Sequence, residues 1–146
     1  MIAVTVDPAP IEVGAEHAAI AASGAGGVAT FTGIVRADDG VAALTLEHYP
    51  GATEAALQVL AEAAAARWDL TGVRVTHRVG RMVPGDLVVF VGTAARHRAA
   101  ALEACAFLID RLKTEAPFWK KETLAAGERW VEPRGSDDAA AARWID

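Results

Sequence analysis

The sequence predicts an α+β fold, a single domain in which strand pairs and helices alternate around a mixed or antiparallel sheet. Two observations support this prediction. A pair of β-rich runs followed by a helical run occurs twice along the 146 residues, an order typical of α+β folds rather than doubly wound parallel sheets. The composition is 53% hydrophobic, and no segment resembles a long linker, so residues 1–146 are expected to share one core.

The N-terminal part contains the first strands. Residues 1–7 are expected to form a strand, and residues 15–22 a short helix that ends in a glycine-rich loop. Residues 28–35 and 41–49 are two β-rich runs, and the Asp-Gly dipeptide at 39–40 favours a tight turn between them. We therefore expect these two runs to pair as a hairpin.

The middle of the chain repeats this order. Thr53 is the expected N-cap of a helix with one apolar face. Residues 73–79 and 87–94 are the next strand pair, and a long helix is expected from about His97 to Glu115. The buried stripe of that long helix is expected to contain Leu102, Cys105, Leu108, Ile109 and Leu112.

The last part begins at Pro117, which cannot continue a helix without losing a backbone hydrogen bond. Residues 118–122 and 128–132 are therefore expected to be extended, with a turn at 126–127. Ser136 is expected to cap a final short helix that ends near Trp144.

Composition excludes several classes of function. A net charge of −5 argues against general nucleic-acid binding, which needs clustered surplus cations. Cys105 is the only cysteine, which excludes an intramolecular disulfide and agrees with a reducing cytosol. The start lacks the basic segment of a signal peptide, and no apolar run approaches the roughly 20 residues that span a bilayer. We expect a cytoplasmic protein without membrane contact.

Common catalytic signatures are also missing. The four histidines lie at 17, 48, 77 and 97, without the spacing of metal ligands. The sequence contains no phosphate-binding loop, nucleophile elbow or Cys-x-x-Cys pair. We therefore predict no metal and no bound cofactor.

The feature that points to chemistry is a set of cations in the last third of the chain. His97 and Arg98 begin the long helix, where positive side chains are unfavourable for stability, while Lys113 lies near its end, where the helix dipole favours a lysine for purely structural reasons. Lys120 and Lys121 follow in an extended segment, so only one of them faces a pocket.

The helix stop allows Lys113 and Lys120 to fold toward each other, and Glu122 shares a face with Lys120. Arg36, at a strand end, is either a further anion ligand or an ordinary surface charge. The aromatic residues Phe118, Trp119, Trp130 and Trp144 are either core or the lining of a groove for an extended peptide tail, and core packing is preferred. The residues alone thus predict an anion-binding site.

Spaced motifs then resemble one family. They are FTGIVR at 31–36, LTLEHYPG at 44–51, HRVG at 77–80, ARHR at 95–98, IDRLKTEAPFWKKE at 109–122 and RWVE at 129–132. In this order they resemble the catalytic large subunit of molybdopterin synthase, the MoaE family, over nearly the whole chain. The resemblance implies an α/β-hammerhead-like fold.

The resemblance also implies an activity and partners. The family converts cyclic pyranopterin monophosphate to molybdopterin by inserting two dithiolene sulfurs. The sulfurs come from the C-terminal Gly-Gly thiocarboxylate of a small ubiquitin-like subunit. Large subunits of this family form a homodimer within a heterotetramer.

Site residues carried over by position have two roles. The resemblance implies that Lys113 and Lys120 are the essential lysines. The expected substrate-binding residues are both lysines together with Ile34, Val35, Arg36, His97, Arg98, Lys121, Glu122 and, across the dimer, Arg134. Ile34 occupies a position where some relatives carry lysine, so only its backbone is expected to line the pocket.

Two rival interpretations use the same residues. One is a binding module that holds a pterin or nucleotide phosphate without turning it over. The other is a scaffold whose aromatic groove captures only a Gly-Gly tail. Alanine substitution of Lys120 separates an enzyme from a binder, because turnover then falls far more than affinity.

Overall fold

The computed structural model describes residues 1–131 and 135–144 of the chain. Its elements, in chain order, are β1 (Ile2–Asp7), α1 (Val13–Ala21), β2 (Gly27–Ile34), the 3-10 turn η1 (Asp38–Gly40), β3 (Ala43–His48), α2 (Ala52–Trp68), β4 (Gly72–Arg78), β5 (Gly80–Met82), β6 (Leu87–Ala95), α3 (Arg98–Glu115), β7 (Phe118–Leu124), β8 (Gly127–Val131) and α4 (Gly135–Ala142).

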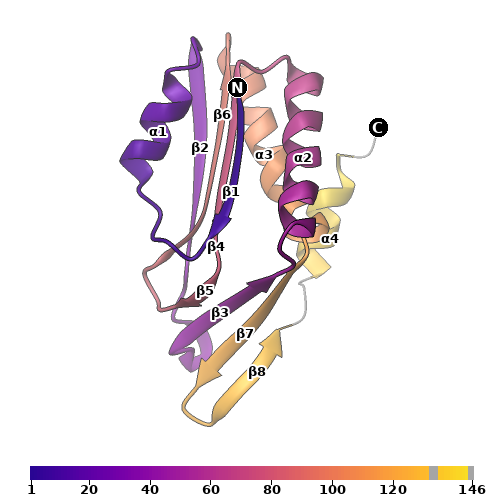
Figure 1. Ribbon diagram of the computed structural model, residues 1–146. Helices are drawn as coiled ribbons and strands as arrows, with labels where there is room; N and C mark the ends of the chain where they lie inside the picture. Colours follow the sequence, from indigo (N-terminus) through magenta and orange to yellow (C-terminus); the bar gives the residue numbers. More distant parts are fainter. Residues whose placement is uncertain (132–134, 145–146) are drawn as a thin grey trace.

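The strands form two four-stranded sheets. The first sheet has the order β1-β4-β6-β2, and the second has the order β5-β3-β7-β8. The β1–β4 pair is parallel, whereas all other pairs are antiparallel. In Figure 1 the first sheet forms the upper part, with α1 on one face and α2 and α3 on the other, and the second sheet lies below it. The predicted α+β class with a mixed sheet is confirmed.

The predicted hairpin between β2 and β3 is wrong. β2 pairs with β6, from Gly27 opposite Ala95 to Ile34 opposite Leu87, whereas β3 pairs with β5 and β7. The Asp-Gly dipeptide does turn the chain, but as part of η1, where the Val41 N–H bonds to the Asp38 carbonyl. The connection is therefore longer than a tight hairpin turn, and it carries β3 into the other sheet.

The predicted cap of α2 is also displaced. Gly51 takes the N-cap position at φ 87°, a backbone conformation that glycine adopts without steric cost. Thr53 lies inside the first helical turn and is completely buried. Its hydroxyl is therefore directed into the protein, as described below.

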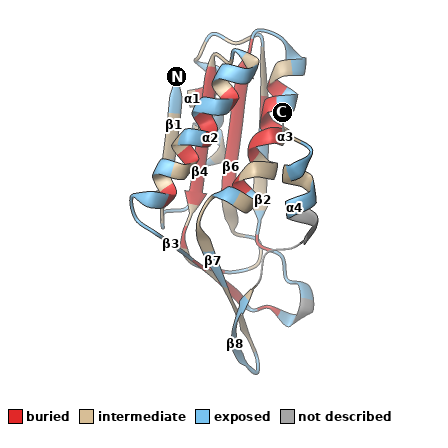
Figure 2. Ribbon diagram, turned by 90° about the vertical axis from the view of Figure 1, so that its right-hand side faces the viewer, coloured by how far each residue is buried: buried red, intermediate tan, exposed pale blue. Residues whose placement is uncertain are grey.

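The main core lies between the first sheet and the α2–α3 pair. Phe90, Val91 and Val89 of β6 are buried, because α1 covers one face of this strand and α3 covers the other (Figure 2). A continuous apolar strand is what such double coverage requires. Val88 contacts both this core and a smaller cluster at the second sheet.

Leu102 departs from the predicted core. The stripe of α3 that packs inward consists of Ala101, Ala104, Cys105, Phe107, Leu108 and Leu112. Leu102 is 61% exposed, and it lines an open surface hollow together with residues 28–31 of β2, the edge strand of the first sheet. Ile109 is half-buried against the same core.

The C-terminal strands follow the prediction with small shifts in their bounds. The turn at Gly127 joins β7 to β8, whose register places Lys121 opposite Trp130. Glu132 and the side chain of Ser136 lie outside the described part of the chain, so the predicted cap at Ser136 has no structural counterpart here. Among the described residues, none of the helices has the length and apolar character needed to cross a membrane.

Candidate functional site

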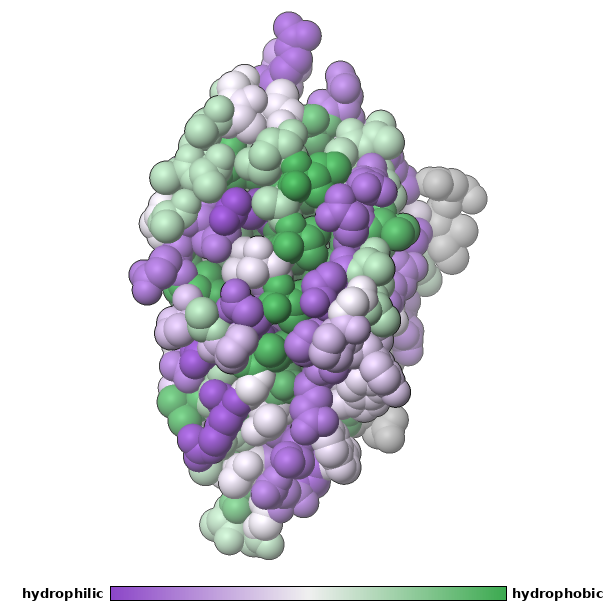
Figure 3. Space-filling view, viewed as in Figure 1, coloured by the Kyte–Doolittle hydropathy of each residue, from purple (hydrophilic) through white to green (hydrophobic). Residues whose placement is uncertain are grey.

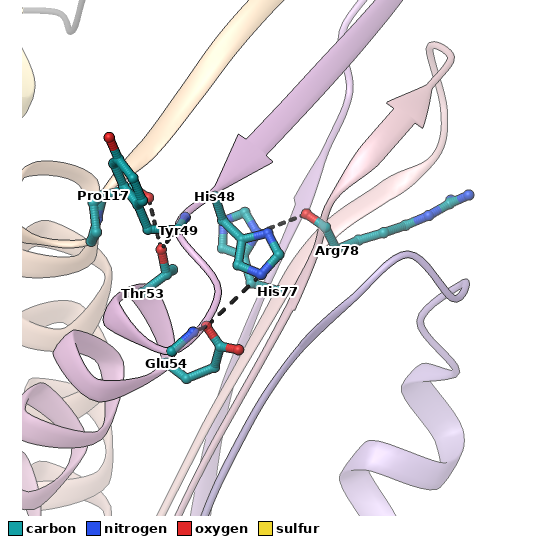
Figure 4. Close-up of polar contacts among 8 residues, drawn as sticks. His48, Tyr49, Thr53, Glu54, His77, Arg78 and Pro117 are labelled. Carbon is teal, nitrogen blue, oxygen red and sulfur yellow. Dashed lines mark hydrogen bonds and ion pairs between the residues drawn. The ribbon is translucent and has the colours of Figure 1, made fainter.

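The candidate site lies where the two sheets meet, beside the start of α2 and the end of α3. Three stretches distant in sequence converge there: the end of β3 with the first turn of α2, the end of β4, and the chain between α3 and β7 (Figure 4). Figure 3 shows hydrophilic side chains over the lower part of one face of the molecule, along the second sheet. The junction therefore joins a dry interior to a polar surface.

Lys113 lies in the last turn of α3 and its side chain is exposed. The helix ends at Glu115, because Ala116 is extended (φ −85°, ψ 126°) and Pro117 follows. The Phe118 N–H bonds back to the Ala116 carbonyl at 3.0 Å, which turns the chain into β7. The predicted helix stop at Pro117 is confirmed.

Lys120 lies on β7, directly opposite Leu46 of β3, and is exposed. Glu122 shares its face, as strand alternation predicts, and accepts a hydrogen bond from Arg129 Nε at 2.9 Å. Lys121 points to the other face of the sheet, where its Nζ lies 3.0 Å from a Glu128 carboxylate oxygen. Of the two neighbouring lysines, Lys120 is therefore the one directed to the junction.

His77 stands at the centre of the junction, at the end of β4. The side chain is 5% exposed, and its ring stacks on the Phe118 ring with centroids 4.0 Å apart. Its Nδ1 lies 2.9 Å from the Arg78 carbonyl oxygen. Because a carbonyl oxygen only accepts, Nδ1 carries the proton and donates it, leaving Nε2 as the acceptor of a neutral ring.

Burial and then the charges of both lysines, Lys113 and Lys120, lower the pKa of His77. Burial lowers the pKa of His77 from 6.5 to about 4, against the opposing effect of the bond to the Arg78 carbonyl. The positive charges of Lys113 and Lys120, and then of His48, lower this pKa further. Two lysines on opposite sides of the helix stop therefore create a common positive potential, which favours an anionic ligand.

Sequence reasoning gave His77 no role in the site, because it weighed this residue as a metal ligand and otherwise quoted it only within the HRVG motif. The available signal was the alternation of β4, which places His77 on the same face as the buried Val73 and Val75. Among the described residues, no group of three or more His, Cys, Asp or Glu side chains is placed to hold a metal ion.

The segment Ile34, Val35 and Arg36 lies at the same end of the molecule as the lysines. Val35 is buried in the small cluster with Leu46, the residue opposite Lys120. Arg36 is exposed, and its Nε lies 3.2 Å from Asp38 Oδ2. Ile34 is 55% exposed. Arg36 is thus an exposed arginine that is paired with a carboxylate at this end of the molecule.

His97 and Arg98 lie at the opposite end of α3. His97 is the N-cap in an extended conformation, without a side-chain capping bond, and both residues are exposed. The loop passes so closely that a Cβ on Gly26 would lie 2.2 Å from the Arg96 carbonyl oxygen. Fifteen helical steps separate Arg98 from Lys113, which is about 22 Å along the helix axis. Within one chain, these two residues do not join the lysine site.

The remaining predicted residues fall into three groups. Arg134 lies outside the described residues. Phe118 stacks at the junction and Trp144 packs edge-on against Trp68 and Phe107. The preferred core interpretation fails for the other two aromatic residues, because Trp119 is 41% and Trp130 is 58% exposed on the open face of the second sheet.

Cys105 is not a nucleophile in this arrangement. It is buried on α3, and burial raises the pKa of its thiol to about 11. Since the thiolate is the reactive form, this thiol is poorly suited to attack a substrate at neutral pH.

Comparisons with known proteins agree with this geometry. Residues 6–115 match the family model described as MoaE protein. The molybdopterin synthase catalytic subunit of Salmonella typhimurium is 52% identical over 145 residues, 97% of each chain.

Solved structures extend the likeness to the fold. A MoaE protein of molybdopterin biosynthesis from Burkholderia ambifaria superposes with a TM-score of 0.86 at 49% identity, over 100% of both chains. A complex of subunits 1 and 2 of the molybdopterin-converting factor from Helicobacter pylori gives a TM-score of 0.78 over 90% of this chain and 91% of that one. At 19% identity it shows the fold alone. By sequence and by fold, this chain belongs to the MoaE family.

Proposed function

We propose that this chain is the catalytic subunit of a molybdopterin synthase, a cytoplasmic sulfurtransferase of molybdenum cofactor biosynthesis in which residues 1–146 act as one domain. The observation that carries the proposal is the position of Lys113 at the end of α3 and Lys120 on β7, on either side of the helix stop where Phe118 stacks on His77. The substrate is cyclic pyranopterin monophosphate, and its phosphate supplies the anion that the two lysine charges favour.

The sulfur donor is the C-terminal thiocarboxylate of a small ubiquitin-like subunit. Two such tails are consumed for each product: each delivers one sulfur as its C–S bond breaks, and a water molecule supplies the oxygen that leaves the tail as an ordinary carboxylate. Burial of Cys105, with the raised pKa of its thiol, supports an external sulfur source. The names of the relatives, which describe a catalytic subunit, support the existence of a second kind of subunit.

Lys113 and Lys120 are the catalytic residues of this proposal. Their charges stabilise the negative charge that develops as the thiocarboxylate reacts and the cyclic phosphate opens. Arg36, with the backbone of Ile34 and Val35, binds the substrate at the same end. Lys121 and Glu122 follow Lys120 on β7 and complete the substrate-binding set. His97, Arg98 and Arg134 bind the phosphate and pterin.

The position of Arg98 supports a homodimer as the working unit. About 22 Å of helix separates it from Lys113 in one chain, so both groups reach one small substrate only if a second copy brings its own His97 and Arg98 to the lysines. The assembly we propose is a homodimer of this chain with one small subunit at each end.

The test is product formation by the purified chain with cyclic pyranopterin monophosphate and a thiocarboxylated small subunit. Product is oxidised to its fluorescent pterin derivative and quantified. Lys120→Ala should abolish most of the product. The matched control is Arg81→Ala, which removes an exposed positive charge from β5, opposite Thr45 on the outer face of the same sheet. Equal product from wild type and Lys120→Ala would refute the assignment.

The rival interpretations are separated by the same materials. A binding module would hold the pterin without forming product, and Lys120→Ala would weaken its affinity alone. A scaffold would bind the small subunit but show no phosphate-dependent affinity for the pterin. Product formation by the wild type excludes both.

A further inference from the structure

The segment between Lys113 and Lys120 is contacted by two buried residues, one through a hydrogen bond and one through a stacked ring. It runs from Ala116 to Phe118 and consists of one extended residue, a proline and the first residue of β7. Nothing in this short stretch is helical, so the angle between α3 and β7 depends on what the segment contacts. The spacing of Lys113 and Lys120 depends on the same contacts.

The first contact comes from Thr53. Its Oγ1 donates to the Pro117 carbonyl oxygen at 2.9 Å and accepts from the Tyr49 N–H at 3.0 Å. The residue is completely buried, although its hydroxyl is not needed to cap α2, whose N-cap is Gly51. One hydroxyl therefore ties the end of β3 and the start of α2 to the carbonyl between the lysines (Figure 4).

The second contact comes from His77. Its ring lies nearly parallel to the Phe118 ring, at an interplanar angle of 23°. The hydrogen bond from Nδ1 to the Arg78 carbonyl fixes the plane of the imidazole. Phe118 follows Pro117 directly, so adjacent residues are held by a hydrogen bond on one side and by a ring contact on the other.

We propose that Thr53 and His77 are positioning residues that together clamp Pro117 and Phe118 and thereby set the spacing of Lys113 and Lys120. The proposal rests on the proposed function, because it assigns the clamp to the lysines of that reaction. Both residues are buried, Thr53 completely and His77 to 5% exposure, so neither is assigned a contact with the substrate. Both act through the segment that carries the lysines.

Thr53→Val tests the hydroxyl with almost no change of side-chain volume, and Thr53→Ser restores it. The matched control is Thr76→Val. Thr76 is also buried, donates a 2.9 Å hydrogen bond to Glu16, and is next to His77 in sequence but faces α1 on the other side of the sheet. His77→Leu removes the ring contact with Phe118, and His77→Phe keeps an aromatic ring in its place.

The first readout is amide hydrogen exchange of residues 113–122, which requires no substrate. Loss of one buried hydrogen bond should speed local opening about fivefold or more in Thr53→Val. Thr53→Ser and Thr76→Val should leave this segment unchanged. His77→Leu should speed exchange, and His77→Phe should restore most of the protection.

The second readout is the split between kcat and KM in the synthase assay. Misplaced lysines should lower kcat on the order of 10- to 100-fold with a much smaller change in KM, and Thr53→Ser should recover the rate. Thr76→Val shows what a loss of stability alone does to kcat. Thermal unfolding of each variant confirms that the compared proteins are folded.

The outcomes separate the two proposals. Unchanged exchange in Thr53→Val and His77→Leu would overturn the clamp. So would faster exchange with an unchanged kcat, or an equal loss of kcat in Thr76→Val. If the wild type forms no product, the proposed function fails. In that case 15N–lysine NMR titration decides the clamp: altered Lys113 and Lys120 titration in Thr53→Val, but not in Thr76→Val, supports it, and unaltered titration overturns it.

Discussion

Acidification from pH 7 to pH 4 should reduce the free energy of unfolding by about 3 kcal/mol through His77 alone. In the folded protein the pKa of His77 is lowered to about 4, from 6.5 in the unfolded chain. The difference is about 2.5 units, and each unit corresponds to 1.36 kcal/mol. The side chain is 5% exposed, so solvent screening removes little of this effect.

The sign follows from proton binding. Between pH 6.5 and about 4 the unfolded chain takes up a proton on His77 that the folded protein does not. Folding stability from this group is therefore complete above pH 6.5, falls as the pH decreases toward 4, and reaches a plateau below. Other groups titrate over the same range, so the measured quantity must be a difference between variants.

Urea unfolding of wild type and His77→Phe at pH 7, 6, 5 and 4 provides that difference. The wild type should lose about 3 kcal/mol more than the variant over this range. His17→Gln, at an exposed position on α1, is the control for replacing a histidine, and it should follow the wild type. Parallel pH profiles for wild type and His77→Phe would refute the conclusion that His77 is buried and neutral.

Three further predictions follow from the same contacts. Lys120→Met should raise the pKa of His77, because one of the positive charges that lower it is removed; histidine NMR titration measures the shift, and an unchanged pKa would show that Lys120 lies elsewhere. Cys105, whose thiol pKa is raised to about 11, should react with iodoacetamide at neutral pH far more slowly in the native protein than in urea; rapid native labelling by mass spectrometry would contradict its burial. Phe107→Ala should lower the free energy of unfolding by about 3 to 5 kcal/mol, since the ring is 3% exposed and contacts both Trp68 and Trp144; a loss below about 1 kcal/mol in urea unfolding would contradict this packing.

The sequence predicted those parts of the site that depend on neighbouring residues alone, namely the helix stop and the strand alternation. Pro117 ends α3, and strand alternation in β7 separates Lys120 from Lys121. Their consequence, one lysine on each side of a helix stop, was visible without any structure. The apolar period of α3 also located Cys105, Leu108 and Leu112, half of its six buried residues.

Predictions from local patterns were wrong where contacts between distant parts of the chain decide the structure. The Asp-Gly dipeptide predicted a hairpin between β2 and β3, yet each strand finds its partners far along the chain, in β6 and in β5 and β7. Leu102 fits the apolar period of α3 but lies beside the edge strand β2 and is exposed. No local pattern tells where a sheet ends.

The role of His77 also depends on contacts that the sequence does not show. Its lowered pKa comes first from burial and then from lysines 36 and 43 positions later in the chain. Thr53 looked like a helix cap because caps favour threonine, but its hydroxyl binds the Pro117 carbonyl. Both assignments need the tertiary contacts.

The rate of dithiolene product formation in a single turnover tests most directly whether Lys113 and Lys120 act together at the junction. The measurement compares wild type, Lys113→Ala, Lys120→Ala and the double variant, with the chain in excess over the pterin substrate and at least two thiocarboxylated small subunits for each substrate molecule. We predict that each single substitution slows product formation on the order of 100-fold or more, and that the double variant is hardly slower than either single one, because residues that act as a unit are not additive. A wild-type rate in either single variant, or losses that multiply in the double variant, would contradict a shared site.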